Sequence, residues 1–290
     1  MAESTALLDS FTAPLASLAS WLAPWEFEPL WGLACLAASA VYLRGVRRLG
    51  RRHPAVGWAR PTAFLAGLAL VYLVSQTHYD YLSQYMFFPH RAQHLVLHHT
   101  APFLMVLAFP GPVLAAGLPA GLEGPRRLAR PLIDVLQQPL VAPLLFVGLI
   151  YFWLIPEVHF DAMLSRELYQ LMNWSMLVDG VLFWWLVLTP STRLGHGRRI
   201  LLLLAVVPPQ ILLGAYLTFS STVLFDVYEV CGRAWPLAPL VDQQLGGLIT
   251  WIPATMMSVI GTLIVLRQLR RGETSDRQTA AAPAPRDATG

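Results

Sequence analysis

The sequence predicts an all-α membrane protein with seven transmembrane helices, and three observations support that prediction. Hydrophobic residues make up 56% of the 290 residues and charged residues only 13%, whereas soluble domains carry about 25% charged residues. Apolar runs bounded by Pro and Arg recur along the chain, each near the ~20 residues that cross a bilayer. All 20 basic residues are arginines, and they gather beside alternate apolar runs, as expected for a chain that crosses a membrane repeatedly.

The N-terminal part of the chain precedes the first span. Apolar side chains recur at helical spacing in residues 1–27, and no Arg lies among them. We expect a periplasmic or interfacial amphipathic segment there, without the basic region of a secretory signal peptide. The first span covers about residues 28–43 and ends at an arginine cluster, and the second covers about residues 61–82.

The third span is predicted at residues 91–109 and ends at Pro110-Gly111-Pro112, a strong helix breaker. A Gly/Pro-rich connection is expected at residues 113–138. The remaining spans are expected at about residues 139–155, 167–188, 200–219 and 244–266. Residues 28–271 thus form one transmembrane domain, and the Ala/Pro/Thr-rich residues 272–290 are expected to be a disordered cytoplasmic tail.

The arginine counts predict the orientation. The loops after the first, third and fifth spans and the C-terminal end hold 6, 3, 3 and 5 arginines, and the opposite side holds only Arg91, Arg166 and Arg233. Arginine accumulates in cytoplasmic loops. The N-terminus is therefore predicted outside and the C-terminus in the cytoplasm.

The third span carries the most informative pattern, a stripe of histidines. His90, His94 and His98 follow one another every four residues and share one face of the helix, while His99 lies about 100° around the axis. The predicted topology brings His78, near the outer end of the second span, to the same level. Ionisable residues within a membrane are functional-site candidates, so His78, His90, His94 and His98 form the candidate metal site. The alternative is that neighbouring helices simply satisfy these histidines.

The same helix contains a proline. Pro102 has no N–H, so the carbonyl group of His98 loses its usual donor, and a kink is expected there.

Side chains of the fifth span extend the candidate site. Met172, Met176 and Asp179 fall within one narrow arc of that helix. Imidazole with thioether ligands suits copper, especially Cu(I), better than Mg²⁺ or Ca²⁺. Asp179 lies in mid-span, where a carboxylate is costly. It is either a hydrogen-bonding group that fixes helix packing or a proton or ion relay.

Three further polar residues receive simpler interpretations. Asp242 precedes the seventh span and is expected to N-cap it. Cys35 falls within the first span and Cys231 in an outer loop, so no disulfide is expected between them. Cys231 is a weak candidate for a transient copper ligand.

Several functions are excluded or disfavoured. The absence of Lys excludes a retinal Schiff base. The arginines lie at helix ends, so they do not indicate nucleic-acid binding. No Gly-rich phosphate loop, Ser/His/Asp order or CxxC motif occurs, and we therefore expect no enzymatic activity.

Four segments resemble the CtaG family of bacterial cytochrome c oxidase assembly factors. They are HRAQHLVLHHTAPFLMVLAFPGP (90–112), GVLFWW (180–185), PPQILLGAYLTFSS (208–221) and, most specifically, DQQLGGLITWIP (242–253). The resemblance implies a multi-pass protein of the bacterial inner membrane that helps assemble active haem-copper oxidase through copper delivery. His90 and His94 match the family motif most securely.

The resemblance also implies partners: haem-copper oxidase subunits, membrane lipid and a periplasmic copper donor. Two other functions remain open. In a membrane cytochrome, His78 and His98 would clamp a haem between adjacent helices. In a passive assembly scaffold, the histidines would bind no metal.

Overall fold

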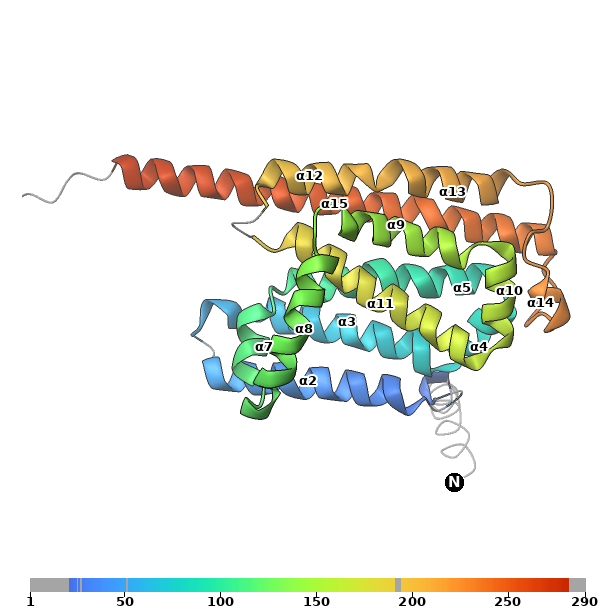
Figure 1. Cartoon of the computed structure of the whole chain (residues 1–290), viewed down its shortest axis with the longest axis horizontal. Coiled ribbons are helices and arrows are strands. Elements are labelled where there is room, and N and C mark those ends of the chain that lie inside the picture. The colour runs from blue at the N-terminus through green and yellow to red at the C-terminus, as the bar shows by residue number, and fades with distance from the viewer. Residues whose placement is uncertain (1–20, 25, 27, 51, 191–193, 282–290) are drawn as a thin grey trace, which may run out of the picture.

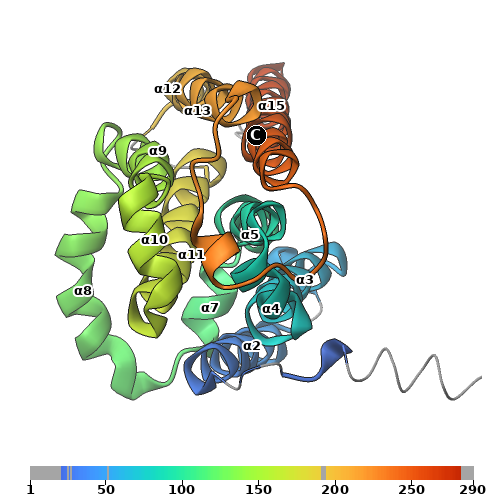
Figure 2. The same cartoon turned by 90° about the vertical axis from the view of Figure 1, so that its right-hand side faces the viewer.

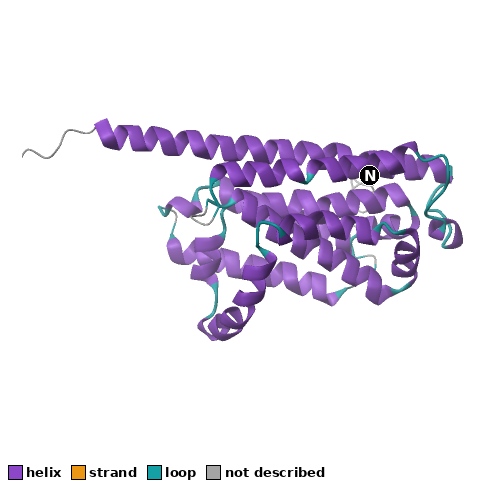
Figure 3. Ribbon diagram, turned by 45° about the horizontal axis from the view of Figure 1, so that its top comes forward, coloured by secondary structure: helices purple, strands orange, loops and turns teal. Residues whose placement is uncertain are grey.

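A computed structural model describes residues 21–281 of the chain, apart from residues 25, 27, 51 and 191–193. In this part every regular element is a helix, and an isolated bridge pairs Pro24 with Thr77 (Figures 1 and 3). The all-α prediction is therefore confirmed. Residues 1–20, which include most of the predicted amphipathic segment, lie outside the described residues.

The helices are long and apolar enough for a multi-pass membrane protein. Four described helices qualify by length and composition: α2 (Pro29–Leu49), α11 (Arg166–Leu188), the continuous pair α12–α13 (His196–Phe219) and α15 over Pro239–Gly272. Two bent pairs raise the number to six: Phe87–Leu107 with Gly111–Gly117, and Gly124–Leu136 with Val141–Trp153. The predicted second span corresponds to α3 (Ala59–Gln76), whose ends carry Arg60 and Gln76 and which is not among these six. Seven spans and their orientation therefore stay predictions.

The histidine helix is the centre of the bundle. It consists of α5 (Phe87–His94), the π-helical segment η2 (Leu95–Thr100) and α6 (Ala101–Leu107), and it packs on α3, α11 and α15 (Figure 2). The π-helical turns accommodate Pro102 within a continuing helix, because the N–H of Ala101 reaches the carbonyl of Val96, five residues back. The sharp turn comes later, at Phe109, whose φ of 48° is left-handed.

The Gly/Pro-rich connection expected at residues 113–138 is largely helical. It contains α7 (Gly111–Gly117), the short 3₁₀ helix η3 (Ala120–Leu122) and α8 (Glu123–Leu136). α7 packs directly on α2: a Cβ atom on Gly45 would lie 1.9 Å from the carbonyl oxygen of Val113, and one on Gly117 would lie 1.9 Å from that of Val41. These glycines permit close helix contact. In the sequence alone, a glycine such as Gly117 in a Gly/Pro-rich segment is more typical of a loop.

The two ends of the bundle differ in their covering elements. At one end, called the α10 end, lie α4 (His78–Tyr85), α10 (Pro156–Leu164) and α14 (Val227–Val230). At the other, called the α8 end, lie α7, α8 and the far part of α15 (Figure 1). α9 (Val141–Trp153), α12 (His196–Ala205) and α13 (Val207–Phe219) complete the bundle, and η1 (Pro54–Val56) joins α2 to α3.

The last helix extends further than predicted. α15 runs from Pro239 to Ala281, so residues 272–281 are helical where a disordered tail was expected. Their Glu, Arg, Gln and Ala residues favour helix. The prediction of a disordered tail rested instead on the Ala/Pro-rich run that follows them. Residues 282–290 lie outside the described residues.

Candidate functional site

The central helix carries an unusual run of buried polar side chains. In α5 and η2 these are His90, Arg91, Gln93, His94, His98 and His99, each at most 4% exposed. Neighbouring helices surround this segment on all sides, so polar groups on every face are withdrawn from solvent. Such groups are costly to bury unless they find partners, and their partners therefore define the site.

His90 and His94 form a hydrogen-bonded pair. Their Nε2 atoms are 3.1 Å apart, and His90 Nδ1 lies 3.2 Å from the carbonyl oxygen of Ser83. A carbonyl only accepts, so His90 Nδ1 carries the proton and its Nε2 accepts from His94. His94 Nδ1 in turn accepts from the guanidinium of Arg91 at 3.1 Å. Both imidazoles are thus neutral, with complementary tautomers.

This pair is tied to two other helices. The Nε2 of His94 also lies 3.0 Å from Asn173 Oδ1 of α11, and Arg91 Nε donates to Thr250 Oγ1 of α15 at 3.0 Å. Every ring nitrogen of His90 and His94 therefore already has a partner. A metal ion bound to either ring would have to displace one of these bonds.

His98 and His99 differ from that pair because each keeps an unpaired nitrogen. His98 Nε2 lies 3.0 Å from Asp179 Oδ2, but the Nδ1 atoms of His98 and His99 are buried without a hydrogen-bond partner. The ring of His98 stacks on Phe146, with centroids 4.0 Å apart. An unpartnered buried nitrogen is rare, so these two atoms distinguish this part of the site.

A small cavity lies beside these rings. Its volume is about 10 Å³, and Arg91, His94, His98, His99 and Met176 are among its lining residues. This is about the space of one water molecule or one ion. The sequence placed Met176 and Asp179 on a common arc. In the structure Met176 lines the cavity with His98 and His99, and Asp179 bonds to His98.

His78 does not share this environment. It lies half-buried at the start of α4, where its ring contacts Trp21 at 4.5 Å and Tyr81 at 5.0 Å between centroids. Across α4, the buried group is instead Asp80, which accepts from Gln93 and Tyr169, each at 2.8 Å. The sequence alone could not identify these partners of Asp80, because a single carboxylate near a helix end does not show which side chains face it.

His159 is the residue that the sequence analysis missed. It is fully buried in α10, and its ring centroid lies 5.1 Å from that of His90. Its Nδ1 donates to the carbonyl of Trp153, and its Nε2 accepts from the hydroxyl of Tyr228, both at 3.0 Å. The available signal was a histidine in a short connection predicted on the same side as His90.

Asp242 has a different role from the one expected. It lies within the first turn of α15, which begins at Pro239, and its carboxylate accepts from the backbone N–H groups of Phe87 and Phe88 at 2.9 and 2.7 Å. Arg233 also donates to it at 2.6 Å. Asp242 therefore caps α5, the histidine helix, instead of its own helix. The prediction was wrong because spacing along one chain segment does not show which helix end lies beside it.

The two cysteines are free, in agreement with the expectation that no disulfide joins them. Burial raises the pKa of the Cys231 thiol. A raised pKa reduces the thiolate fraction, the form that binds metals. Cys231 is therefore a poorer copper ligand than an ordinary exposed thiol.

The described side chains are not arranged as a complete metal site. Among the described residues, no three His, Cys, Asp or Glu side chains are grouped as a metal site. The residues with open donor atoms are His98 and His99, with the Met176 thioether at the same cavity. Nitrogen and thioether donors of this kind suit Cu(I), whereas the neighbouring Arg91 charge opposes any cation.

These features define a class: a multi-pass α-helical membrane protein whose central helix buries a histidine-rich polar network. The chain belongs to the cytochrome c oxidase caa3 assembly factor family (Caa3_CtaG), whose family model matches residues 40–272. The resemblance noted from the sequence is thereby confirmed. The matched range includes the whole histidine helix.

Similar proteins occur in mycobacteria. One from Mycobacterium bovis and one from Mycobacterium tuberculosis are each 29% identical over 279 residues, which cover 91% of this chain and 42% of the relative. One from Mycobacterium leprae is 29% identical over 259 residues, covering 83% and 38%. All three are described as uncharacterized proteins. The chain thus spans about two fifths of their length, and no solved structure matches it.

Proposed function

We propose that this protein assists haem-copper oxidase assembly in the bacterial inner membrane by holding copper in its buried core and releasing it to oxidase subunits. One observation carries the copper part of the proposal. The Nδ1 atoms of His98 and His99 are buried without partners, and both residues border a cavity with Met176. Membership of the assembly-factor family supports the oxidase as the partner.

The donor set fits a weakly held soft ion. His98, His99 and Met176 offer two imidazole nitrogens and one thioether, and His94 lies at the same cavity. Cu(I) accepts such ligands. The Asp179 carboxylate, bonded to His98, offsets part of the positive charge of Arg91. When bound, copper would be cargo, transferable by ligand exchange to the oxidase or from a periplasmic donor.

The predicted ligand set of His78, His90, His94 and His98 is therefore revised in this proposal. His98 is retained, and His99 and Met176 are added. His94 is retained as a ligand that would exchange one of its hydrogen bonds for the ion. His90 positions His94 through their shared hydrogen bond. His78, which packs on Trp21 and Tyr81, is given no ligand role.

The test compares single variants in purified protein. His94→Ala, His98→Ala and His99→Ala should each lower Cu(I) affinity, by more than the ~10–100-fold loss seen when only a metal site's outer partners are disturbed. Cells carrying them should contain oxidase subunits without copper or activity, partly restored by added copper. His196→Ala, at the start of α12 near the α8 end, is the control.

A passive scaffold is the second candidate, and one observation favours it. The His90–His94 pair is already saturated by Ser83, Arg91 and Asn173, as expected for a purely structural network. If all three alanine variants match His196→Ala in copper binding and oxidase activity, the copper proposal is wrong and the scaffold replaces it. The haem alternative has no such support, because the cavity beside His98 is about 10 Å³ and a porphyrin is far larger.

A further inference from the structure

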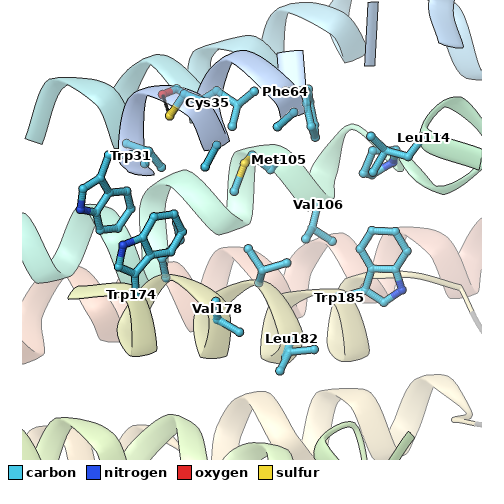
Figure 4. A pocket seen from close by; sticks show the side chains of 17 residues that line it. Trp31, Cys35, Phe64, Met105, Val106, Leu114, Trp174, Val178, Leu182 and Trp185 are labelled. Carbon is cyan, nitrogen blue, oxygen red and sulfur yellow. Dashed lines mark hydrogen bonds between the residues drawn. The ribbon is translucent and has the colours of Figure 1, made fainter. Parts of the chain in front are cut away.

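Two adjoining cavities reach the α8 end of the bundle. The first, of about 330 Å³, is an apolar groove between α2, α3, α6 and α11 (Figure 4). The second, of about 760 Å³, lies between α8 and α11. Val181, Leu182 and Trp185 line both. The two cavities therefore meet along one face of α11.

The groove is long and narrow. In Figure 4, Trp31 and Trp174 lie at one end, and Trp185 lies at the other. Trp174 and Trp185 are both on α11, so the groove extends about 16 Å along that helix at the α-helical rise of 1.5 Å per residue. Its shape suits a hydrocarbon chain, whereas another helix, about 10 Å across, would not enter it.

The second cavity is bordered by positive charge. Arg126, Arg127 and Arg130 of α8 line it together with Ile133 and Gln137. Arg130 lies 3.8 Å from Asp134, and both of these side chains are largely exposed, so its charge is partly neutralised. Arg126 and Arg127 have no acidic partner among the side chains that the structure describes. The charged residues that line this cavity are all arginines.

The orientation of α8 suits a membrane surface. Its residues Gly124–Leu136 meet α9 at 80°, so α8 runs across the bundle while α9 runs along it (Figure 2). Leu128 and Leu132 are 84% and 62% exposed. An amphipathic helix with arginines on one side and exposed leucines on another typically lies in the headgroup region of a bilayer.

We propose that these two cavities bind one anionic phospholipid, with its phosphate on Arg126 and Arg127 and an acyl chain in the groove lined by Leu182 and Trp185. Arginine guanidinium groups pair with phosphate in a bidentate manner. The apolar lining excludes water from the chain. The headgroup charge matches the arginines of α8, which makes an anionic lipid a better occupant than a zwitterionic one. The proposal is independent of copper binding.

The test is native mass spectrometry of the full chain in detergent, mixed with equal amounts of dioleoyl phosphatidylglycerol and dioleoyl phosphatidylcholine. The wild-type protein should retain phosphatidylglycerol preferentially. The double variant Arg126→Gln/Arg127→Gln should weaken that binding on the order of 10-fold, given the attraction of each arginine to an anionic lipid surface. Arg44→Gln/Arg47→Gln is the matched control, because it removes two exposed arginines from α2.

Two further measurements separate a lipid site from a phosphate site. Leu182→Trp should fill the groove and weaken phosphatidylglycerol binding, whereas Leu212→Trp, at an exposed position of α13, should not. Millimolar glycerol phosphate should leave the bound lipid in place.

Equal losses of phosphatidylglycerol binding in the two double-arginine variants would overturn the proposal in favour of general charge attraction. Displacement by glycerol phosphate, with Leu182→Trp without effect, would replace it with a site for free phosphate. Should Leu182→Trp fail to fold, the arginine variants on exposed positions still decide.

Discussion

The two ends of the bundle treat polar residues in opposite ways. Towards the α10 end, polar side chains point inward and bond to each other, as Asp80 does with Gln93 and Tyr169. At the α8 end, the arginines of α8 are exposed and line a cavity that adjoins an apolar groove. The first arrangement consists of specific hydrogen bonds between buried side chains. The second consists of exposed positive charge beside an apolar surface. The copper proposal rests on a buried polar network of the first kind, and the lipid proposal rests on the exposed arginines and the groove.

Two buried arginines sharpen this contrast. Arg91, in the histidine helix, donates to His94 and Thr250, which are side chains of the candidate site. Arg199, at the α8 end, donates at 2.7 Å to the carbonyls of Val187 and Leu188, at the end of α11. Carbonyls in the last turn of a helix have no partner within that helix, and the Leu188 carbonyl also accepts from Gln268 Nε2 at 3.0 Å. The same residue type thus supports the site at one position and only a helix end at the other.

The largest expected effect concerns orientation: the α10 end is predicted on the periplasmic side of the membrane and the α8 end on the cytoplasmic side. A reporter active only in the periplasm should be active when fused after Ser221, at the α10 end, and silent when fused after Gly272. The reason is the predicted alternation of arginine-rich loops. Reporter activity in whole cells measures it. The reverse pattern would place the α8 arginines outside and overturn the predicted orientation.

The next effect concerns the cap on the histidine helix. Asp242→Ala should lower the free energy of unfolding by about 1–3 kcal/mol, because it leaves two N–H groups of α5 uncapped and leaves Arg233 with Glu229 as its remaining acidic partner. Thermal unfolding in detergent and protein abundance measure the loss. Asp226→Ala, an exposed position in the same connection, should be nearly neutral. If the two variants were equally stable, the cap would have no energetic importance.

A smaller loss is expected where α11 crosses the histidine helix. A Cβ atom on Gly180 would lie 2.4 Å from the carbonyl oxygen of His98, so Gly180→Ala should force the helices apart at a cost of about 1–3 kcal/mol. Gly148→Ala in α9 meets no atom within 4 Å and should be neutral or slightly stabilising. Comparison of their melting temperatures tests the close approach. A neutral Gly180→Ala would mean that the helices can separate freely.

The smallest structural effect is expected at Asp179. In Asp179→Asn, the amide oxygen can still accept from His98 Nε2, so we expect a stability change below about 1 kcal/mol and normal protein abundance. Oxidase activity relative to abundance is the measurement. Retained activity indicates that Asp179 orients His98 by a hydrogen bond. Lost activity at normal abundance would instead assign it a proton or ion relay.

The sequence by itself determined the helical class, the positions of the apolar runs and the histidine stripe. Runs of apolar residues near bilayer length, interrupted by Arg and Pro, leave few alternatives to membrane helices. Four-residue spacing alone places His90, His94 and His98 on one face. The tertiary structure confirmed that these three residues are buried in the central helix.

Only the tertiary structure decided the partners. Helices that are apolar all round give little periodic signal of their rotation, so the sequence could not show that His159 faces His90 or that Asp242 caps α5. The sequence could not show that Gly117 of α7 faces α2, or that Gly45 of α2 faces α7, because close helix contact depends on both surfaces. Hydrogen bonds are short and directional. Which histidine nitrogens are paired and which are left open, at His98 and His99, therefore follows from how the helices pack.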